Sequence, residues 1–258
     1  MRPSLARSLM PIAALALAGA CNSVQAGTVV PCDGHCTWSV EADGVEIGSG
    51  SYQVDPTSGE ISLASPLKIS LGDGSWASVN TMTGNADPIL GFNVSAGTGA
   101  VGKTFAFSFS LPIELSGPVN ASSSVSYSLT SLSSAGAQID PLSGHVVTAQ
   151  EVDTSVGGLT PLNKGVDIGP RFFFFGGPQT QNSPVYTATN TFVGDLAYDL
   201  MSVTIAFSLS ANSKVGASGF VEQLPAPVPL PAAVWLLGSG LLSLGGLARR
   251  RNLNRSGV

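Results

Sequence analysis

Apolar side chains occupy every second position in three segments in the middle of this chain. From Thr104 to Leu111, three phenylalanines and a leucine alternate with alanine and serine, and the same period recurs from Met201 to Leu209 and from Val125 to Leu129. Successive side chains of a β-strand point to opposite faces, so a period of two predicts strands with one face buried. No segment before residue 232 shows a helical period of 3.6 residues.

Weaker strand patterns and turn signals fill the remainder of residues 27–224. The weaker strands are expected at Thr37–Ala42, Leu67–Leu71, Trp76–Met82, Ile89–Val94, His145–Ala149 and Val185–Val193. Turns are expected at Asp43-Gly44, Asp73-Gly74, Asp87-Pro88, Asp140-Pro141 and Gly176-Gly177-Pro178. The sequence therefore predicts an all-β ectodomain, a single jelly-roll-like β-sandwich of eight to ten strands. Two smaller sandwiches divided near residues 149–164 are the alternative.

The charged residues are segregated along the chain. All sixteen acidic residues and only five cations lie between Gly27 and Leu224, so this part has a net charge of −11, against −5 for the whole chain. An acidic body without a basic patch argues against nucleic acid as a partner.

Residues 1–26 have the pattern of a secretory signal peptide. Two arginines precede an apolar run from Leu9 to Ala20, and small residues stand before a cleavage site between Ala26 and Gly27. The run is too short to span a bilayer comfortably. A lipoprotein site at Ala18–Cys21, with Cys21 acylated, is the alternative.

Cleavage after Ala26 leaves two cysteines, Cys32 and Cys36. In an oxidising compartment we expect them to form a disulfide across a tight loop. A metal site that includes His35 is the alternative, but a zinc site needs about four ligands and the only other histidine is His145. No metal and no cofactor are expected.

The last residues have the pattern of a membrane anchor. A proline-rich spacer at 225–231 precedes an uncharged apolar segment at 232–248, which we expect to be a transmembrane helix. A basic tail at 249–258 follows and begins with the membrane stop Arg249, Arg250 and Arg251. The positive-inside rule places this tail in the cytoplasm.

The same segment resembles the PEP-CTERM sorting signal in its VPLPA variant. The short motif, the apolar helix and the arginine-rich end follow one another in the family's order, and the motif itself is Val228, Pro229, Leu230, Pro231 and Ala232. The resemblance covers about a tenth of the chain. It implies a Gram-negative source, recognition and processing by an exosortase, and release from the inner membrane to the cell surface or the exopolysaccharide matrix.

The family sorts many unrelated ectodomains, so the resemblance indicates a route and not a task. We expect an exported structural or adhesive surface protein that is not an enzyme. One alternative is a carbohydrate-binding module that stacks sugars on Trp38, Tyr52 or Trp76. The other is a secreted hydrolase that uses His35 or His145, although no catalytic motif accompanies either histidine.

Three further segments invite a functional interpretation. Gly97–Thr104 matches the phosphate-loop pattern, but a strand is predicted where nucleotide binding needs a helix, so we expect a glycine-rich hairpin loop. Phe172–Phe175 is interpreted as a strand buried on both faces, with an exposed aromatic rim as the alternative. Asp33, Asp43 and Asp73 are interpreted as solvated turn residues rather than calcium ligands.

Overall fold

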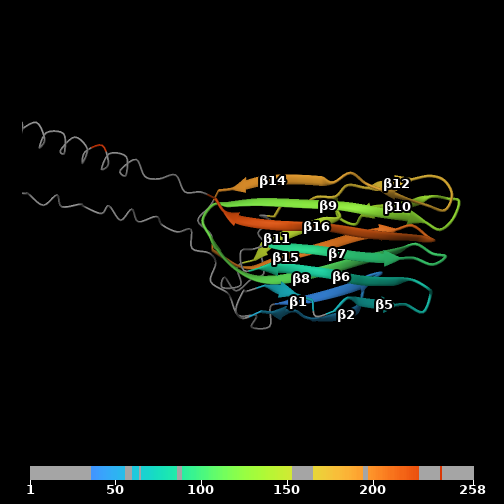
Figure 1. Cartoon of the computed structure of the whole chain (residues 1–258), viewed down its shortest axis with the longest axis horizontal. Helices are drawn as coiled ribbons and strands as arrows, with labels where there is room; N and C mark the ends of the chain where they lie inside the picture. The colour runs from blue at the N-terminus through green and yellow to red at the C-terminus, as the bar shows by residue number, and fades with distance from the viewer. Residues whose placement is uncertain are drawn as a thin grey trace, which may run out of the picture.

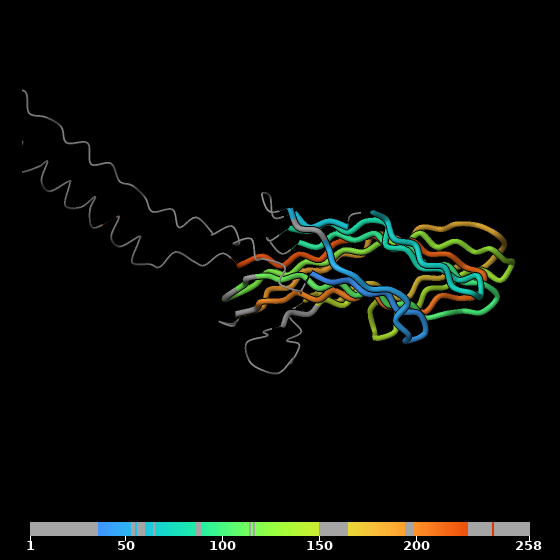
Figure 2. Tube along the Cα trace, turned by 90° about the horizontal axis from the view of Figure 1, so that it is seen from below, coloured from blue at the N-terminus to red at the C-terminus, as the bar shows by residue number. Residues whose placement is uncertain are grey.

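The computed structural model of the chain describes residues 36–55, 60–63, 65–85, 89–152, 165–193 and 197–226, together with Ser239. Two antiparallel sheets stack face to face in these ranges (Figures 1 and 2). This confirms the predicted all-β, sandwich-like fold.

Sheet A has seven strands, in the order β12-β10-β15-β8-β1-β2, and β11 pairs with β15 beside this path. Its strands are β1 (Thr37–Ala42), β2 (Val45–Ser51), β8 (Lys103–Ser116), β10 (Ala137–Pro141), β11 (Val147–Val152), β12 (Phe172–Phe174) and β15 (Ala197–Leu209).

Sheet B has nine strands, in the order β13-β9-β16-β7-β6-β4-β3, while β14 pairs with β9 and β5 pairs with β6. Its strands are β3 (Gln53–Val54), β4 (Ile61–Ser62), β5 (Leu67–Ser70), β6 (Trp76–Asn85), β7 (Ile89–Gly97), β9 (Val119–Ser131), β13 (Gln179–Asn182), β14 (Tyr186–Phe192) and β16 (Ser213–Pro225).

The core lies between the two sheets and follows the period-two pattern. From Phe105 to Leu111 in β8 and from Met201 to Leu209 in β15, every second residue is a fully buried apolar one, and the residues between them are half-exposed on the outer face. The ring of Phe207 lies 6.1 Å from that of Phe105 and 6.2 Å from that of Phe107. Sheet B contributes Leu129 and Val221, among others, from its inner face. Burial of this continuous apolar layer is the main force that holds the sheets together.

Strands from both halves of the chain share each sheet. β15 pairs with β8 in sheet A, and β16 pairs with β9 and β7 in sheet B. The described residues therefore form one sandwich, not two divided near residues 149–164. Its sixteen strands exceed the eight to ten that were predicted, because β16 and several short strands lack a clear apolar alternation.

Of two predicted turns, the structure confirms Asp43-Gly44 and contradicts Asp140-Pro141. Asp43 and Gly44 have φ angles of 50° and 75° and join β1 to β2, as a hairpin turn with two positive φ values requires. Asp140-Pro141 is not a turn, because both residues belong to β10 and pair with β15.

The signal peptide, the sorting motif, the membrane stop and almost all of the predicted transmembrane segment lie outside the described residues and stay predictions. Within the described ranges, the structure contains no helix long and apolar enough to cross a membrane.

Candidate functional site

The first three residues of the phenylalanine run form β12, an edge strand of sheet A that pairs with β10, and Phe175 follows the strand. Phe174 is buried and Phe172 packs 6.4 Å from the Tyr127 ring, whereas Phe173 and Phe175 are 46% and 79% exposed. The prediction of a strand buried on both faces is therefore wrong, because β12 covers the core with one face only. The two exposed rings lie 5.5 Å apart, nearly edge to face at 72°.

Arg171 holds the nearer of these rings in place. Its guanidinium carbon lies 4.8 Å from the centre of the Phe173 ring. The same guanidinium group forms an ion pair with Asp140 at 2.9 Å and donates a hydrogen bond of 2.7 Å to Gln138 Oε1. Gln138 Nε2 in turn donates to Asp140. The cation is thus neutralised and fixed, and Phe175 keeps a freely exposed ring beside it.

Outward-facing polar side chains continue from this aromatic pair across sheet A. The register places Ser208 opposite both Asp140 and Thr104. The backbone N–H of Gln138 donates to Ser210 Oγ at 2.9 Å. A shallow groove of about 290 Å³ follows these positions, lined by Asp43, Gly102, Lys103, Thr104, Gln138, Asp140, Ser208, Leu209 and Ser210.

Lys103 forms the far wall of the groove. Its ammonium group lies 2.6 Å from Asp43 Oδ2 and 3.0 Å from Asp73 Oδ2. These hydrogen bonds, with Asp43 the stronger partner, raise the pKa of Lys103. The Lys103 bond, followed by the Thr104 N–H, lowers the pKa of Asp43. The Ser75 N–H, followed by Lys103, lowers that of Asp73. All three groups are therefore charged at neutral pH.

This arrangement explains why Gly97–Thr104 is not a phosphate loop. Strand β8 begins where a helix would be needed, and two carboxylates occupy the lysine ammonium group. The segment is also not the predicted hairpin loop, because β7 belongs to sheet B and β8 to sheet A. It crosses from one sheet to the other, and Thr98 fastens it with a 2.6 Å bond to the Ser210 carbonyl.

The three aromatic residues predicted to stack sugars do not form one surface. Tyr52 is buried. Trp38 is in β1 of sheet A and packs against the core, whereas Trp76 is in β6 of sheet B. The Lys68 ammonium group lies 4.9 Å from the centre of the Trp76 ring and covers it. An exposed aromatic pair exists, but it is Phe173 and Phe175.

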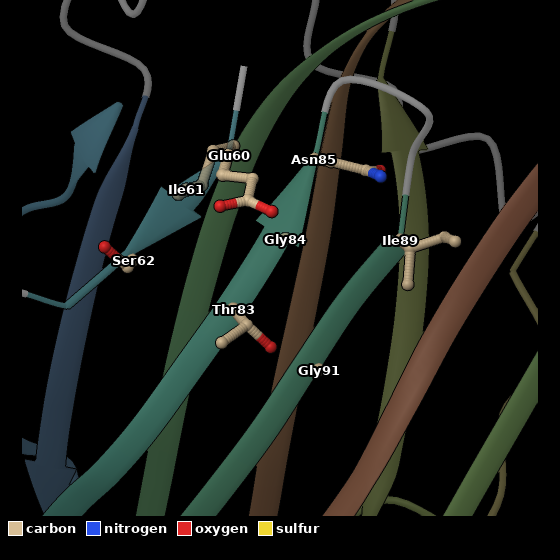
Figure 3. A pocket seen from close by; sticks show the side chains of 8 residues that line it. All are labelled: Glu60, Ile61, Ser62, Thr83, Gly84, Asn85, Ile89 and Gly91. Carbon is tan, nitrogen blue, oxygen red and sulfur yellow. The ribbon is translucent and has the colours of Figure 1, made fainter. Parts of the chain in front are cut away.

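A second groove, of about 330 Å³, lies on sheet B where β4, β6 and β7 meet (Figure 3). Its lining residues are Glu60, Ile61, Ser62, Thr83, Gly84, Asn85, Ile89 and Gly91. Figure 3 shows the Glu60 carboxylate and the Asn85 amide on its walls. No aromatic ring belongs to this lining set, so the groove lacks a surface on which a sugar could stack.

The residues of the hydrolase and metal-site alternatives are only partly described. His145 is exposed, and His35 lies outside the described residues. No group of three or more potential metal-ligating side chains occurs in the part of the chain that the structure describes. Cys36 is disulfide-bonded. Its predicted partner, Cys32, is not among the described residues, so that pairing stays a prediction.

The aromatic pair and the polar groove lie at one end of the sandwich. Leu209 pairs with Lys103 at this end, whereas Pro225, the last residue of β16, pairs with Val119 at the other. Figure 1 shows β16 running toward that opposite end. The candidate site and the last residue of β16 therefore lie at opposite ends of the sandwich.

Comparisons with known proteins give structural similarity only. No protein-family description and no curated protein sequence matches the chain. Among solved structures, TmCBM61 in complex with β-1,4-galactotriose aligns at 9% identity with a TM-score of 0.28, covering 73% of this chain and 88% of that chain. The CBM22-1 xylan-binding domain from Paenibacillus barcinonensis Xyn10C aligns at 10% identity with a TM-score of 0.20, covering 68% and 91%.

A third similar structure is an enzyme, the Arthrobacter globiformis T6 isomalto-dextranase complexed with panose. It aligns at 14% identity with a TM-score of 0.17, and the match covers 70% of this chain but 30% of that chain. Identities and TM-scores this low assign neither a family nor a ligand to this chain.

Proposed function

We propose that this chain is an exported, non-catalytic surface protein whose sandwich binds polysaccharide. The supporting observation is the exposed Phe173–Phe175 pair, which continues directly into the polar groove of sheet A. A pyranose ring has an apolar face of C–H groups and a rim of hydroxyl groups. An aromatic ring suits the face, and the carboxylate, amide and hydroxyl groups of the groove suit the rim.

The charges favour a neutral polysaccharide. Asp140 neutralises Arg171, and two carboxylates surround Lys103, so no free cation lines the groove among the described residues. The body of the protein has a net charge of −11. An anionic polymer would be repelled by this field and would find no unpaired cation to bind.

We also propose that the protein reaches the cell surface or the extracellular matrix by the export and sorting route that its sequence predicts. The signal at 1–26 would direct export, and the VPLPA-type motif with its basic end would bring the chain to an exosortase. The location of the groove is compatible with this route, because a domain attached through residue 225 would present the groove away from its attachment. The sequence predicts a structural or adhesive role, and we propose that the protein fulfils it by adhering to a glycan matrix.

Affinity electrophoresis of the full chain in gels that contain a dissolved polysaccharide tests the proposal. The gels would contain galactan, xylan or mixed-linkage β-glucan as neutral polymers, and polygalacturonate as the anionic one. We expect at least one neutral polymer to retard the protein and Phe175→Ala to weaken retardation at least about tenfold, as truncation of a binding hot spot does.

Phe220→Ala is the matched control, because Phe220 is an exposed phenylalanine on sheet B. Equal retardation of both variants and the wild type would place binding elsewhere. Retardation by polygalacturonate alone would contradict the inferred charge preference.

A further inference from the structure

One edge of sheet B has an uncharged sequence. Strands β13 and β14 both pair with β9, and no described strand pairs with their other side. Figure 1 shows β14 at the border of the sandwich. No charged residue occurs from Phe172 to Gly194, so this whole edge is neutral in a body of net charge −11.

The free side of β14 has the properties of a pairing surface. Alternate backbone N–H and C=O groups of an edge strand point away from its only neighbour and can accept another strand. Thr187, Thr189 and Thr191 are exposed. Val185 and Val193, next to the two ends of the strand, are 65% and 87% exposed. Such β-branched side chains favour strand pairing.

The other sheet edges carry a charge within the strand or beside it, which is one device by which natural sheets prevent edge-to-edge association. Glu46 is in β2, Lys68 in β5 and Glu151 in β11, while Arg171 precedes β12 and Asp55 follows β3. Among the described edges, that of β13 and β14 alone lacks this protection.

The sequence of this edge is nearly symmetric about Thr189. Residues 185–193 read Val-Tyr-Thr-Ala-Thr-Asn-Thr-Phe-Val. When two copies run antiparallel about a two-fold axis at Thr189, Val185 faces Val193, Tyr186 faces Phe192 and Thr187 faces Thr191. Aromatic pairs and threonine pairs in these positions are the cross-strand contacts that stabilise a sheet.

We propose that β14 pairs with β14 of a second copy of this chain and joins two nine-stranded sheets into one. A two-fold contact requires a self-complementary surface, and the symmetry about Thr189 provides it. The neutrality of the edge allows two strongly acidic bodies to approach there. Because the candidate polysaccharide site belongs mainly to sheet A, pairing through sheet B would give a divalent binder.

Sedimentation velocity of the full chain over a range of concentrations tests the pairing. In Thr189→Lys the two new charges would face each other at the axis, so we expect dimerisation to weaken at least about tenfold, and the same for Thr189→Glu. An equimolar mixture of the two variants should associate again, because lysine then faces glutamate. This recovery also shows that neither variant is merely misfolded.

Thr83→Lys is the matched control. Thr83 is an exposed threonine of β6 that pairs with Ser62 on one side and Gly91 on the other, so its strand has no free edge at that position. The Thr83→Lys variant should dimerise like the wild type. A wild-type chain that stays monomeric at about 1 mM, Thr189→Lys that associates like wild type, or a mixture that stays monomeric would overturn the proposal.

Discussion

Lys103 Nζ lies 2.6 Å from Asp43 Oδ2, so the first residue of β8 is bonded to the turn between β1 and β2. The same ammonium group bonds Asp73 at 3.0 Å, in the turn between β5 and β6 of sheet B. One cation therefore ties together three connections from both sheets at the end of the sandwich where the candidate site lies.

This cluster should make stability depend on pH at both ends of the scale. Because the pKa values of Asp43 and Asp73 are lower in the folded protein, these two carboxylates stabilise the fold above about pH 4, their unfolded pKa. That stabilisation is lost as the pH falls through their folded pKa values. Because the pKa of Lys103 is higher in the folded protein, its ammonium group stabilises the fold below about pH 10.4, its unfolded pKa. That stabilisation is lost as the pH rises through the folded pKa. We expect Lys103→Met to lower the unfolding free energy at pH 7 but not near pH 2. Parallel pH profiles of the two proteins would contradict this.

Phe207 should be among the most sensitive core positions, because it is fully buried between Phe105 and Phe107. We expect Phe207→Ala to lower the unfolding free energy by about 3–5 kcal/mol, through lost burial and the cavity that remains. The exposed Phe220→Ala should cost about 1 kcal/mol or less. Urea denaturation curves measure both, and similar midpoints would contradict the assignment of the core.

Gly169 and Gly117 both have left-handed φ angles, of 101° and 80°, but differ in the space around them. A Cβ at Gly169 would collide with the Tyr127 hydroxyl, whereas one at Gly117 would meet nothing within 4 Å. Gly117→Ala should therefore cost about 1–2 kcal/mol through backbone strain alone. Gly169→Ala should cost about 1–3 kcal/mol more through overpacking. Thermal unfolding of the two variants gives the comparison.

The disulfide of Cys36 should join it to Cys32 in the exported protein. Proteolysis without reductant, followed by mass spectrometry, should give one linked peptide that holds both cysteines. We expect no free thiol in that species before reduction. A link from Cys36 to Cys21 would show that the signal segment is retained and would contradict cleavage after Ala26.

Intact mass of the protein from the membrane and the medium of its native host should show how its ends are processed. We expect a secreted species that starts at Gly27 and ends near the Val228–Ala232 motif. A membrane-bound species that keeps residues 249–258 would instead indicate a plain anchor. A lipid-modified N-terminus at Cys21 would support the lipoprotein alternative.

The sequence predicted the strands whose inward positions carry large apolar side chains. β8, β9 and β15 fall where the period of two placed them, and β1 spans the predicted Thr37–Ala42. It did not predict β16, whose inward positions include Ala217, Gly219 and the polar Gln223, residues that do not register as an apolar alternation. This strand is nevertheless central to sheet B, because β9 and β7 hold it on either side.

The residues of the candidate site, too, could be predicted from the sequence only in part. The phenylalanine run drew attention from the sequence alone, and an exposed rim was one of its two interpretations. Nothing in the sequence linked Gln138 and Asp140 to this site, because they lie more than thirty residues before the run and only the pairing of β10 with β12 brings them beside it. Trp38 and Trp76 looked suitable as partners in the sequence, but the chain places them on different sheets.

The sequence by itself determined that this chain forms β-strands with one buried face, because side-chain alternation is a local property of a strand. It also predicts export and sorting from patterns at its two ends, which depend on contiguous residues. Only the tertiary structure decided which strands are neighbours, which phenylalanines are exposed and which edge lacks charge. Those properties depend on pairings between residues far apart in the chain, and local side-chain periodicity contains no information about them.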